Sequence, residues 1–215
     1  MIKKIKKILD KKNKSKIVCL TAYSKSIASI LDKFVDIILV GDSMANVLYG
    51  HKNTHKISLK NILQHTSSVK MGVNNSLLVV DMPKGSYQNI KIANKNVKLV
   101  INKTKCDAIK LESNGKNYKI IESLVKKKIP VMGHIGYTPQ FKRNFKIEGT
   151  SKLDGLKLLK EAKAIEKAGA FSIVLECISP WTAKLITREL DIPTIGIGSS
   201  SYCDGQILVT DDMLG

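Results

Sequence analysis

The sequence predicts an α/β fold, a (β/α)8 barrel, from the order of its apolar segments. Eight short runs rich in β-branched residues recur along 215 residues, at 16–23, 36–43, 76–83, 107–113, 129–136, 171–178, 192–199 and 205–211. Longer segments with apolar residues three and four apart separate many of them, as in amphipathic helices. Repeated strand and helix is typical of parallel strands with right-handed crossovers, and eight strands indicate a closed TIM barrel.

The first predicted helix precedes the first strand. In "IKKIKKILDKK", Ile2, Ile5 and Ile8 fall on one helical face. This pattern favours a helix that closes the bottom of a barrel over one that lies on a membrane, because no other segment has a membrane signal. Further helical patterns occupy 24–34, 58–72, 89–102, 116–128 and 152–169.

The C-terminal end departs from the repeating pattern. The sequence reads "TDDMLG" directly after the eighth run, with no helical pattern to follow. A barrel without its last helix would leave strand side chains of the first and eighth units exposed. We therefore expect a single domain over residues 1–215 whose last barrel helix is missing, either because the natural sequence continues beyond Gly215 or because the protein is a degraded variant.

Composition limits the classes of partner. The chain has 36 basic and 18 acidic residues and a net charge of +18. Only two of the basic residues are arginine, and four Phe and one Trp leave few stacking platforms, so we expect no nucleic-acid partner. No stretch approaches the roughly 20 apolar residues of a membrane span. The four cysteines form no CxxC pair, and we expect them to be reduced in a cytoplasmic protein.

Acidic residues end four of the predicted strands, namely Asp42, Asp81, Glu112 and Glu176. The chemistry of a (β/α)8 barrel sits at the carboxyl ends of its strands, where we expect these side chains to converge. Each acid alone could cap a helix or stabilise a turn. Four clustered carboxylates repel one another unless a cation or a bound proton compensates, and oxygen ligands are those that Mg²⁺ prefers.

Two basic side chains share these strand ends. Lys110 lies two residues before Glu112, so both side chains point to the same face of the strand. An inward lysine is costly unless it meets an anion, which predicts a contact with a substrate carboxylate; the alternative is a lysine that reaches out to water. His134 ends another strand and suits a structural or a catalytic role equally.

Eight motifs follow one another along the chain in a recognisable order. They are "LTAYS", "ILVGDSMANVLYGHKNT", "LLVVDMPKGSY", "AIKLES", "IPVMGHIGYTPQ", "GAFSIVLECI", "IPTIGIGSS" and "CDGQILVTDDMLG". Together they resemble the ketopantoate hydroxymethyltransferase family. The resemblance implies a cytoplasmic, homo-oligomeric and often decameric Mg²⁺-dependent barrel. It implies transfer of a one-carbon unit from methylene-tetrahydrofolate to 3-methyl-2-oxobutanoate, which gives 2-dehydropantoate in pantothenate biosynthesis.

The resemblance also implies roles for individual residues. The expected metal ligands are three acids at strand ends: Asp42, Asp81 and Glu112. The expected substrate contacts are Asp42, Ser43, Asp81, Lys110 and His134. Glu176 is the expected proton acceptor. A 2-keto acid can chelate Mg²⁺, and a separate carboxylate can then remove the proton beside the ketone.

The chain departs from the family pattern at a few positions. Ser24 stands where Asp is usual, Ala45 and Asn46 where Gly-Met is common, and Ser113 and Asn114 where the family has Gly-Gly. None of these changes removes a predicted ligand. Two alternatives remain at this stage: another Mg²⁺-dependent lyase or mutase of the phosphoenolpyruvate mutase and isocitrate lyase type acting on 2-keto acids, and an inactive truncated relic.

Overall fold

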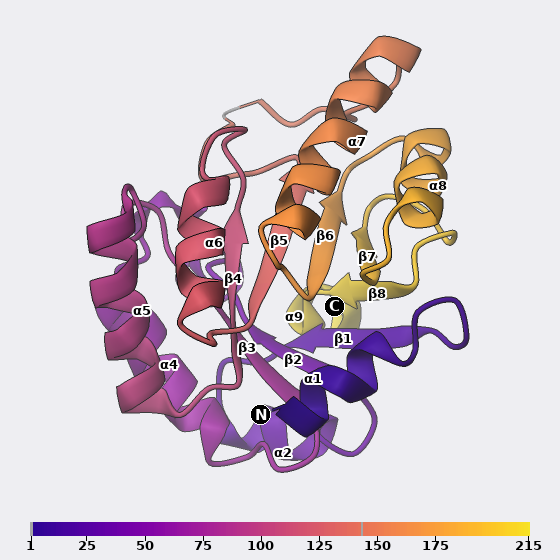
Figure 1. Cartoon of the computed structure of the whole chain (residues 1–215). Coiled ribbons are helices and arrows are strands. Elements are labelled where there is room, and N and C mark those ends of the chain that lie inside the picture. Colours follow the sequence, from indigo (N-terminus) through magenta and orange to yellow (C-terminus); the bar gives the residue numbers. More distant parts are fainter. Residues whose placement is uncertain (1, 143) are drawn as a thin grey trace. The chain divides into compact units, whose positions relative to one another are not determined.

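The computed structural model of the chain describes residues 2–142 and 144–215. Eight strands form a closed parallel barrel in chain order (Figure 1). They are β1 (Ile17–Thr21), β2 (Ile37–Val40), β3 (Leu77–Asp81), β4 (Ala108–Glu112), β5 (Val131–Gly136), β6 (Ser172–Glu176), β7 (Thr194–Ile197) and β8 (Gly205–Leu208). Each strand lies within one of the eight predicted runs, so the predicted (β/α)8 fold is confirmed.

The chain divides into two compact units, which are described separately. Unit 1 comprises Met1–Ile17 and Leu111–Ile207, and unit 2 comprises Val18–Lys110 and Leu208–Gly215. The expectation of a single domain over residues 1–215 stays a prediction.

In unit 2, helices cover the outer faces of β2 and β3. The helices are α2 (Lys25–Leu31), α3 (Met44–Val47), the 3-10 helix η1 (Thr54–Lys56), α4 (Leu59–Lys70), α5 (Ile90–Thr104) and the short α9 (Thr210–Leu214). Helix α4 packs on β2 and β3 and lies between α2 and α5 (Figure 1). Ser58 starts α4 with a capping box, in which Asn61 bonds back to the Ser58 backbone. Ile62, Thr66 and Val69 form its buried face.

In unit 1, the helices are α1 (Ile2–Leu9), α6 (Tyr118–Lys126), α7 (Lys152–Lys167) and α8 (Pro180–Glu189). Helix α7 packs on β5 and β6 and against α6 and α8. It buries Leu158, Ala162 and Ile165, at the spacing of one helical face. Helix α1 forms as predicted and buries Ile8, whereas the side chain of Ile2 lies outside the described residues.

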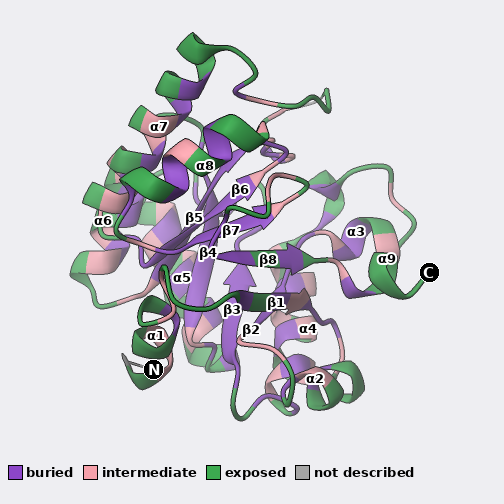
Figure 2. Cartoon of the chain, turned by 90° about the vertical axis from the view of Figure 1, so that its right-hand side faces the viewer, coloured by how far each residue is buried: buried purple, intermediate pink, exposed green. Residues whose placement is uncertain are grey.

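The first and the last strand of the barrel, β1 and β8, are less completely buried than strands β2 to β5. Every residue of β2, β3, β4 and β5 is buried, whereas β1 and β8 alternate between buried and exposed residues (Figure 2). Val18 on β1 is 45% exposed and Leu208 on β8 is 47% exposed. The predicted exposure of these two strands is therefore confirmed.

A short helix follows β8, where the sequence predicts none. Helix α9 spans five residues, and its first turn carries Asp211 and Asp212, which interact favourably with a helix N-terminus. The Thr210 hydroxyl donates to the backbone oxygen of Thr21 at 2.6 Å and fixes the start of this turn. The prediction that no helix follows the eighth strand is therefore wrong, because α9 forms there, although it is only about one and a half turns long.

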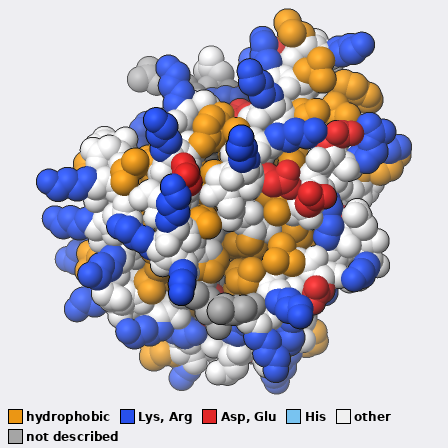
Figure 3. Space-filling view, in the orientation of Figure 1, with side chains coloured by type: hydrophobic (Ala, Val, Ile, Leu, Met, Phe, Trp, Pro, Cys, Tyr) orange, Lys and Arg blue, Asp and Glu red, His pale blue; other side chains and the backbone are white. Residues whose placement is uncertain are grey.

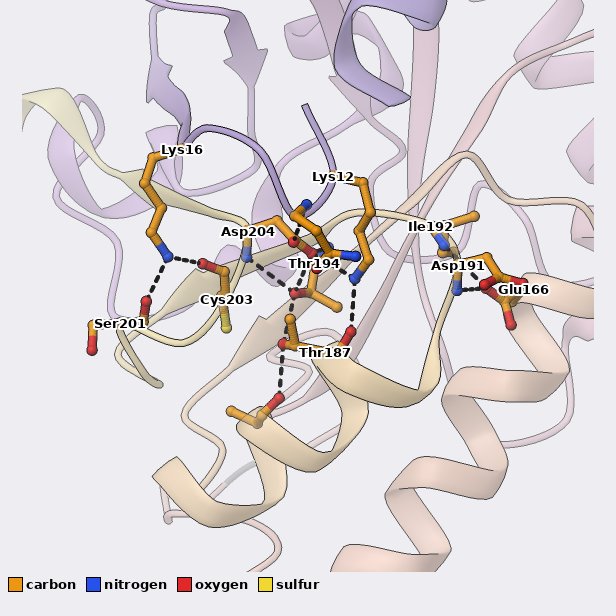
Figure 4. Close-up of polar contacts among 12 residues, drawn as sticks. Lys12, Lys16, Glu166, Thr187, Asp191, Ile192, Thr194, Ser201, Cys203 and Asp204 are labelled. Carbon is orange, nitrogen blue, oxygen red and sulfur yellow. Dashed lines mark hydrogen bonds and ion pairs between the residues drawn. The ribbon is translucent and has the colours of Figure 1, made fainter. Parts of the chain in front are cut away.

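A buried ion pair fixes the segment after α1 within unit 1 (Figure 4). Lys12 Nζ lies 2.8 Å from Asp204 Oδ2 and donates to the backbone oxygen of Thr187 at 2.7 Å. Asp204 Oδ2 also accepts from the backbone N–H of Thr194 at 2.8 Å and from its hydroxyl at 3.0 Å. This network ties the start of β1 to the segments around β7.

The surface carries many basic side chains. Lysines and arginines are scattered over the face shown in Figure 3, with acidic and apolar side chains among them. Within the described residues, no helix combines the length and the apolar content that a membrane crossing needs.

Candidate functional site

A buried ion pair joins β3 and β4 in unit 2. Asp81 and Lys110 are register partners on these neighbouring strands, and Lys110 Nζ lies 2.6 Å from Asp81 Oδ2. The exposed fractions of the two side chains are 6% for Lys110 and 3% for Asp81. A lysine buried this deeply needs a negative partner, because desolvation of an ammonium group costs several kcal/mol. The alternative of a lysine that reaches out to water is therefore wrong, whereas the contact of Lys110 with a substrate carboxylate stays a prediction.

Asp42 and Ser43 lie just beyond β2 in the same unit. Strands β2 and β3 pair with Val40 opposite Val80, so Asp81 and the Asp42–Ser43 turn follow neighbouring strand ends. Asp42 is 4% exposed, and Ser43 begins α3 without capping it through its side chain.

Tyr23 is a site residue that the sequence reasoning did not single out. Its hydroxyl lies 2.9 Å from Ser43 Oγ, and only 6% of the residue is exposed. Burial raises the pKa of Tyr23 to about 12, and the negative charges of Asp211 and Asp42 add to this. Tyr23 therefore stays a neutral hydrogen-bonding phenol beside Ser43. The only sequence signal for it is its place in "LTAYS".

A histidine holds the backbone of Tyr23. His65 Nδ1 lies 2.8 Å from the Tyr23 carbonyl oxygen, and His65 Nε2 lies 2.9 Å from the Tyr49 hydroxyl. Since a carbonyl oxygen only accepts, Nδ1 carries the proton and Nε2 accepts from the Tyr49 O–H. This chain of hydrogen bonds runs from α4 to the segment after β1 and fixes Tyr23 for its contact with Ser43.

In unit 1, three titratable side chains from consecutive strands lie together. His134 on β5 places Nε2 at 3.1 Å from Glu176 Oε2 on β6 and Nδ1 at 3.8 Å from Glu112 Oε1 on β4. His134 and Glu112 have side chains that are 1% exposed, whereas the Glu176 side chain is 21% exposed. Glu176 is therefore the member of this group that a molecule entering from solvent can reach.

Backbone groups bond to the Glu112 carboxylate and to the main chain of Glu176. Glu112 Oε2 accepts from the backbone N–H of Gln140 at 3.0 Å, and Tyr137 donates its backbone N–H to the Glu176 carbonyl oxygen at 2.8 Å. Burial and then the charges of Glu176 and Glu112 raise the pKa of the Tyr137 hydroxyl. The segment "GYTPQ" thus contacts the Glu112 carboxylate through Gln140 and the Glu176 main chain through Tyr137, two contacts that the sequence motif alone could not locate.

Cys177 follows Glu176 in a backbone conformation that is rare for a side-chain-bearing residue. Its φ angle is 51°, in the left-handed region that costs of order 1 kcal/mol or more outside glycine. The Cys177 N–H donates to the Ile197 carbonyl oxygen, and its own carbonyl oxygen accepts from the Glu148 N–H. Burial, and then the charge of Glu176, raises the pKa of the Cys177 thiol to about 11. The thiol is therefore neutral beside the proton acceptor that the sequence predicts.

Residues that depart from the family pattern have local structural roles. Ser24 caps α2 by accepting from the Ile27 backbone N–H, as an Asp could also do. Asn46 donates through Nδ2 to the His51 carbonyl oxygen at 2.8 Å, and Ala45 is fully buried. Ser113 donates to Glu161 Oε1 at 2.5 Å, a contact that glycine cannot make.

The acidic residues have the chemistry of a magnesium site. Asp42, Asp81 and Glu112 are 4%, 2% and 0% exposed, and buried carboxylate oxygens are hard ligands that suit Mg²⁺. Among residues 2–142 and 144–215, no group of three or more His, Cys, Asp or Glu side chains is arranged so that it could hold a metal ion. The Lys110 ammonium supplies the positive charge next to Asp81. The residue types therefore suit the ion, whereas the described residues do not bring three of them together around one point.

The whole described chain matches one known family. Residues 2–215 match the family model described as "Ketopantoate hydroxymethyltransferase". The chain belongs to the ketopantoate hydroxymethyltransferase family. A relative from Pelagibacter ubique (strain HTCC1062), named 3-methyl-2-oxobutanoate hydroxymethyltransferase, is 54% identical over 215 residues, which cover 100% of this chain and 84% of the relative.

Other members of the ketopantoate hydroxymethyltransferase family agree. Relatives of the same name from Anaplasma marginale (strain St. Maries) and Clostridium botulinum (strain Alaska E43 / Type E3) are 45% and 47% identical. The first match covers 100% of this chain and 79% of the relative, and the second covers 95% and 76%. The resemblance inferred from the eight motifs is thereby confirmed.

Solved structures support the fold alone. A putative phosphonomutase from Burkholderia cenocepacia J2315 has a TM-score of 0.77 at 11% identity, with 99% of this chain and 93% of that chain covered. A 2,3-dimethylmalate lyase, described as a PEP mutase/isocitrate lyase superfamily member, has a TM-score of 0.74 at 14% identity, with 98% and 81% covered. At such identities the likeness extends to the barrel and not to the chemistry.

Proposed function

We propose that this chain transfers a hydroxymethyl group from methylene-tetrahydrofolate to 3-methyl-2-oxobutanoate. With one water consumed, the products are 2-dehydropantoate, a coenzyme A precursor, and tetrahydrofolate. Family membership and the names of relatives up to 54% identical support the reaction. The observation that carries the proposal is the buried Lys110–Asp81 pair, because it keeps a cation at a strand end where an anionic keto acid can meet it.

The proposed contacts of the keto acid begin with side chains of unit 2, namely Lys110 and Ser43. The Lys110 ammonium has three N–H donors, and one of its contacts is Asp81 Oδ2 at 2.6 Å; a substrate carboxylate is proposed as a further partner of this cation. Ser43 Oγ offers a further hydrogen bond and is positioned by the Tyr23 hydroxyl at 2.9 Å. Asp42 and His134 are proposed as the other substrate contacts.

The proposed metal ligands are Asp42, Asp81 and Glu112, whose oxygen donors suit Mg²⁺. When bound, Mg²⁺ supplies Lewis-acid stabilisation of the negative charge that develops on the keto acid oxygens, worth several kcal/mol. Lys110 contributes positive charge to the same end. The chain's own carboxylates thereby serve both to hold the ion and to place it.

Glu176 is the proposed proton acceptor. Its carboxylate takes the proton from the carbon next to the ketone, and His134 Nε2 lies 3.1 Å from Glu176 Oε2. The carbon then bonds to the one-carbon unit of the donor. Both bonds from that unit to the two donor nitrogens break, each with its electron pair on nitrogen: the substrate carbon replaces one nitrogen, and the hydroxyl of a water replaces the other. The proton taken from the substrate and the second proton of the water end on the two nitrogens, which gives tetrahydrofolate. Glu176 suits this task because it is the partly exposed member of its group.

The setting proposed for this activity is the cytoplasm, with the chain as part of a homo-oligomer. All four cysteines are free and buried, a usage common in reducing compartments. The oligomer is an inference from the family resemblance. Sedimentation velocity of the purified chain measures its assembly size directly, and a monomer at working concentration would contradict this part of the proposal.

One assay tests the reaction. Purified protein is incubated with Mg²⁺, methylene-tetrahydrofolate and 3-methyl-2-oxobutanoate, and 2-dehydropantoate is measured by mass spectrometry. In a parallel sample without the folate, exchange of the substrate proton for deuterium is followed by NMR. We expect product in the first sample and exchange in the second, both abolished by EDTA. Absence of both in an intact, folded sample would refute the proposal.

Two variants separate the proposed roles. Asp81→Asn is expected to weaken Mg²⁺-dependent binding of the keto acid, because it removes a metal ligand and the partner of Lys110. Glu176→Gln is expected to leave that binding within about threefold and to lower proton exchange by a hundredfold or more, in the range of general-base catalysis. Glu122→Gln, on the exposed face of α6, is the matched control. Equal loss of binding in both site variants would contradict the division of roles.

A further inference from the structure

A cavity of about 240 Å³ opens at the carboxyl ends of β4 and β5 in unit 1. Its walls include Ser113 and Gly115 after β4, Gly136 at the end of β5, Phe141 and Lys142 in the following loop, and Glu161 on α7. At about 30 Å³ for each water in the liquid, this space equals about eight waters and is comparable with a bicyclic ring.

The cavity lies beside the strand that carries Glu176, the proposed proton acceptor, but Glu176 is not among its lining residues. Gly136 is the register partner of Glu176 on β6, and a Cβ atom at Gly136 would lie 2.1 Å from the Glu176 carbonyl oxygen. Ser113 is the residue directly after Glu112. Two residues of the cavity wall, Ser113 and Gly136, are therefore backbone neighbours of Glu112 and Glu176.

One acidic side chain determines what the cavity can recognise. Glu161 is half-buried, and its Oε1 accepts the Ser113 hydroxyl at 2.5 Å. A carboxylate has roughly four lone-pair positions, so this bond leaves capacity for further N–H donors. The charge of Glu161, after burial, raises the pKa of the Tyr118 hydroxyl, which keeps that neighbour neutral. The Glu161 carboxylate in the cavity wall can therefore accept hydrogen bonds from adjacent N–H groups of a bound molecule.

The remaining walls favour a flat and uncharged ring. Lys142 Nζ donates to the Gly136 carbonyl oxygen at 2.8 Å and pairs with Glu148 Oε1 at 2.9 Å, so its charge is already balanced. Phe141 is 44% exposed and presents an aromatic surface. A heterocycle with an amide N–H next to an amino group, such as a 2-amino-4-oxopyrimidine ring, matches these walls.

We propose that this cavity is the subsite for the pterin ring of the one-carbon donor. Glu161 accepts the ring amide N–H and the neighbouring amino group, Ser113 positions the Glu161 carboxylate, and Phe141 covers the ring. The proposal rests on the proposed function, because it names where the folate of that reaction binds. The anionic tail of a folate extends to the surface, where the chain's net charge of +18 is favourable.

Variants of Glu161 and Phe141 test the subsite. Tetrahydrofolate binding is measured by isothermal titration, and keto acid proton exchange without folate is measured by NMR on the same preparations. Glu161→Gln keeps an oxygen for Ser113 and loses the charge, and we expect a roughly tenfold or greater loss of tetrahydrofolate affinity with proton exchange retained. Phe141→Ala is expected to cost about threefold to tenfold, and Phe141→Tyr to restore binding. The control is Glu122→Gln, which should bind like the unchanged protein.

The outcomes separate this proposal from the proposed function. Unchanged tetrahydrofolate affinity in Glu161→Gln and Phe141→Ala, with proton exchange intact, overturns the subsite and leaves the reaction standing. Absence of proton exchange in the unchanged protein refutes the proposed function. If Glu161→Gln nevertheless loses tetrahydrofolate affinity, that loss still supports the subsite. Guanosine carries the same 2-amino-4-oxopyrimidine edge and serves as the competing probe. Guanosine binding as tight as that of tetrahydrofolate would assign the cavity to a nucleoside and overturn the pterin proposal.

Discussion

At the scale of single residues, Tyr23 shows how burial keeps a phenol in its neutral, hydrogen-bonding form. A pKa of about 12 lies above the ordinary value of 10, so the phenol stays protonated as the pH rises through 10 and keeps its hydrogen bond with Ser43. An ionised phenol would instead place a negative charge near Asp42, which burial makes costly.

Tyr23→Phe is expected to weaken keto acid binding about fivefold, because a neutral hydrogen bond contributes about 1 kcal/mol. The variant should also remove the tyrosine that ionises near pH 12 from an alkaline absorbance titration. Tyr202→Phe, at a residue that is 54% exposed, is the matched control for both measurements. Keto acid affinity equal to that of the unchanged protein would show that Ser43 does not need Tyr23.

The sequence predicted the strand-end positions of the candidate residues better than their contacts. Asp81 and Lys110 could be assigned to strand ends because each closes an apolar run, but their ion pair depends on the register between β3 and β4. Register is set by packing of whole strands and is not readable from one of them. The Ser113–Glu161 bond joins residues 48 positions apart through a helix–strand contact, which no local pattern encodes.

At the scale of elements, the Lys12–Asp204 pair holds the segment between α1 and β1 (Figure 4). Lys12→Met is expected to lower the free energy of unfolding by about 3–5 kcal/mol, because it leaves the buried Asp204 carboxylate without its cation. Urea unfolding followed by circular dichroism measures this loss.

The controls use the same segment. Lys14→Met changes an exposed lysine nearby and should stay within about 0.5 kcal/mol. The double variant Lys12→Met with Asp204→Asn should recover part of the loss, since no net charge is then buried. A loss below about 1 kcal/mol for Lys12→Met would mean that the pair contributes little and that packing of α1 fixes the segment.

Elements with a strong apolar pattern were predicted and short ones were not. All eight strands could be placed because buried β-branched runs are distinctive, and α4, α5 and α7 because their apolar residues repeat at helical spacing. Helices α3 and α9 span four and five residues, too few for a periodic pattern. Helix α8 starts at Pro180 and buries mainly Thr182, Ala183, Ile186 and Thr187, a weakly apolar face that was not predicted.

At the scale of the whole molecule, barrel strands are normally covered on their outer side by helices. The sequence predicted exposure of the first and eighth strands, and the 45% and 47% exposed fractions of Val18 and Leu208 agree. Exposed apolar side chains on strands favour contact with other molecules, including further copies of the same chain.

Val18→Thr combined with Leu208→Gln is therefore expected to reduce self-association, as measured by static light scattering over a range of concentrations. Both side chains are largely in water already, so the free energy of unfolding should change by only about 0.5 kcal/mol, and threonine keeps the β-branched shape that suits a strand. Val79→Thr, at a fully buried position of β3, is the contrasting control and should cost about 1–3 kcal/mol by burying a hydroxyl. If the double variant loses as much stability as Val79→Thr, these two side chains are covered in solution. Unchanged self-association would mean that other surfaces hold the copies together.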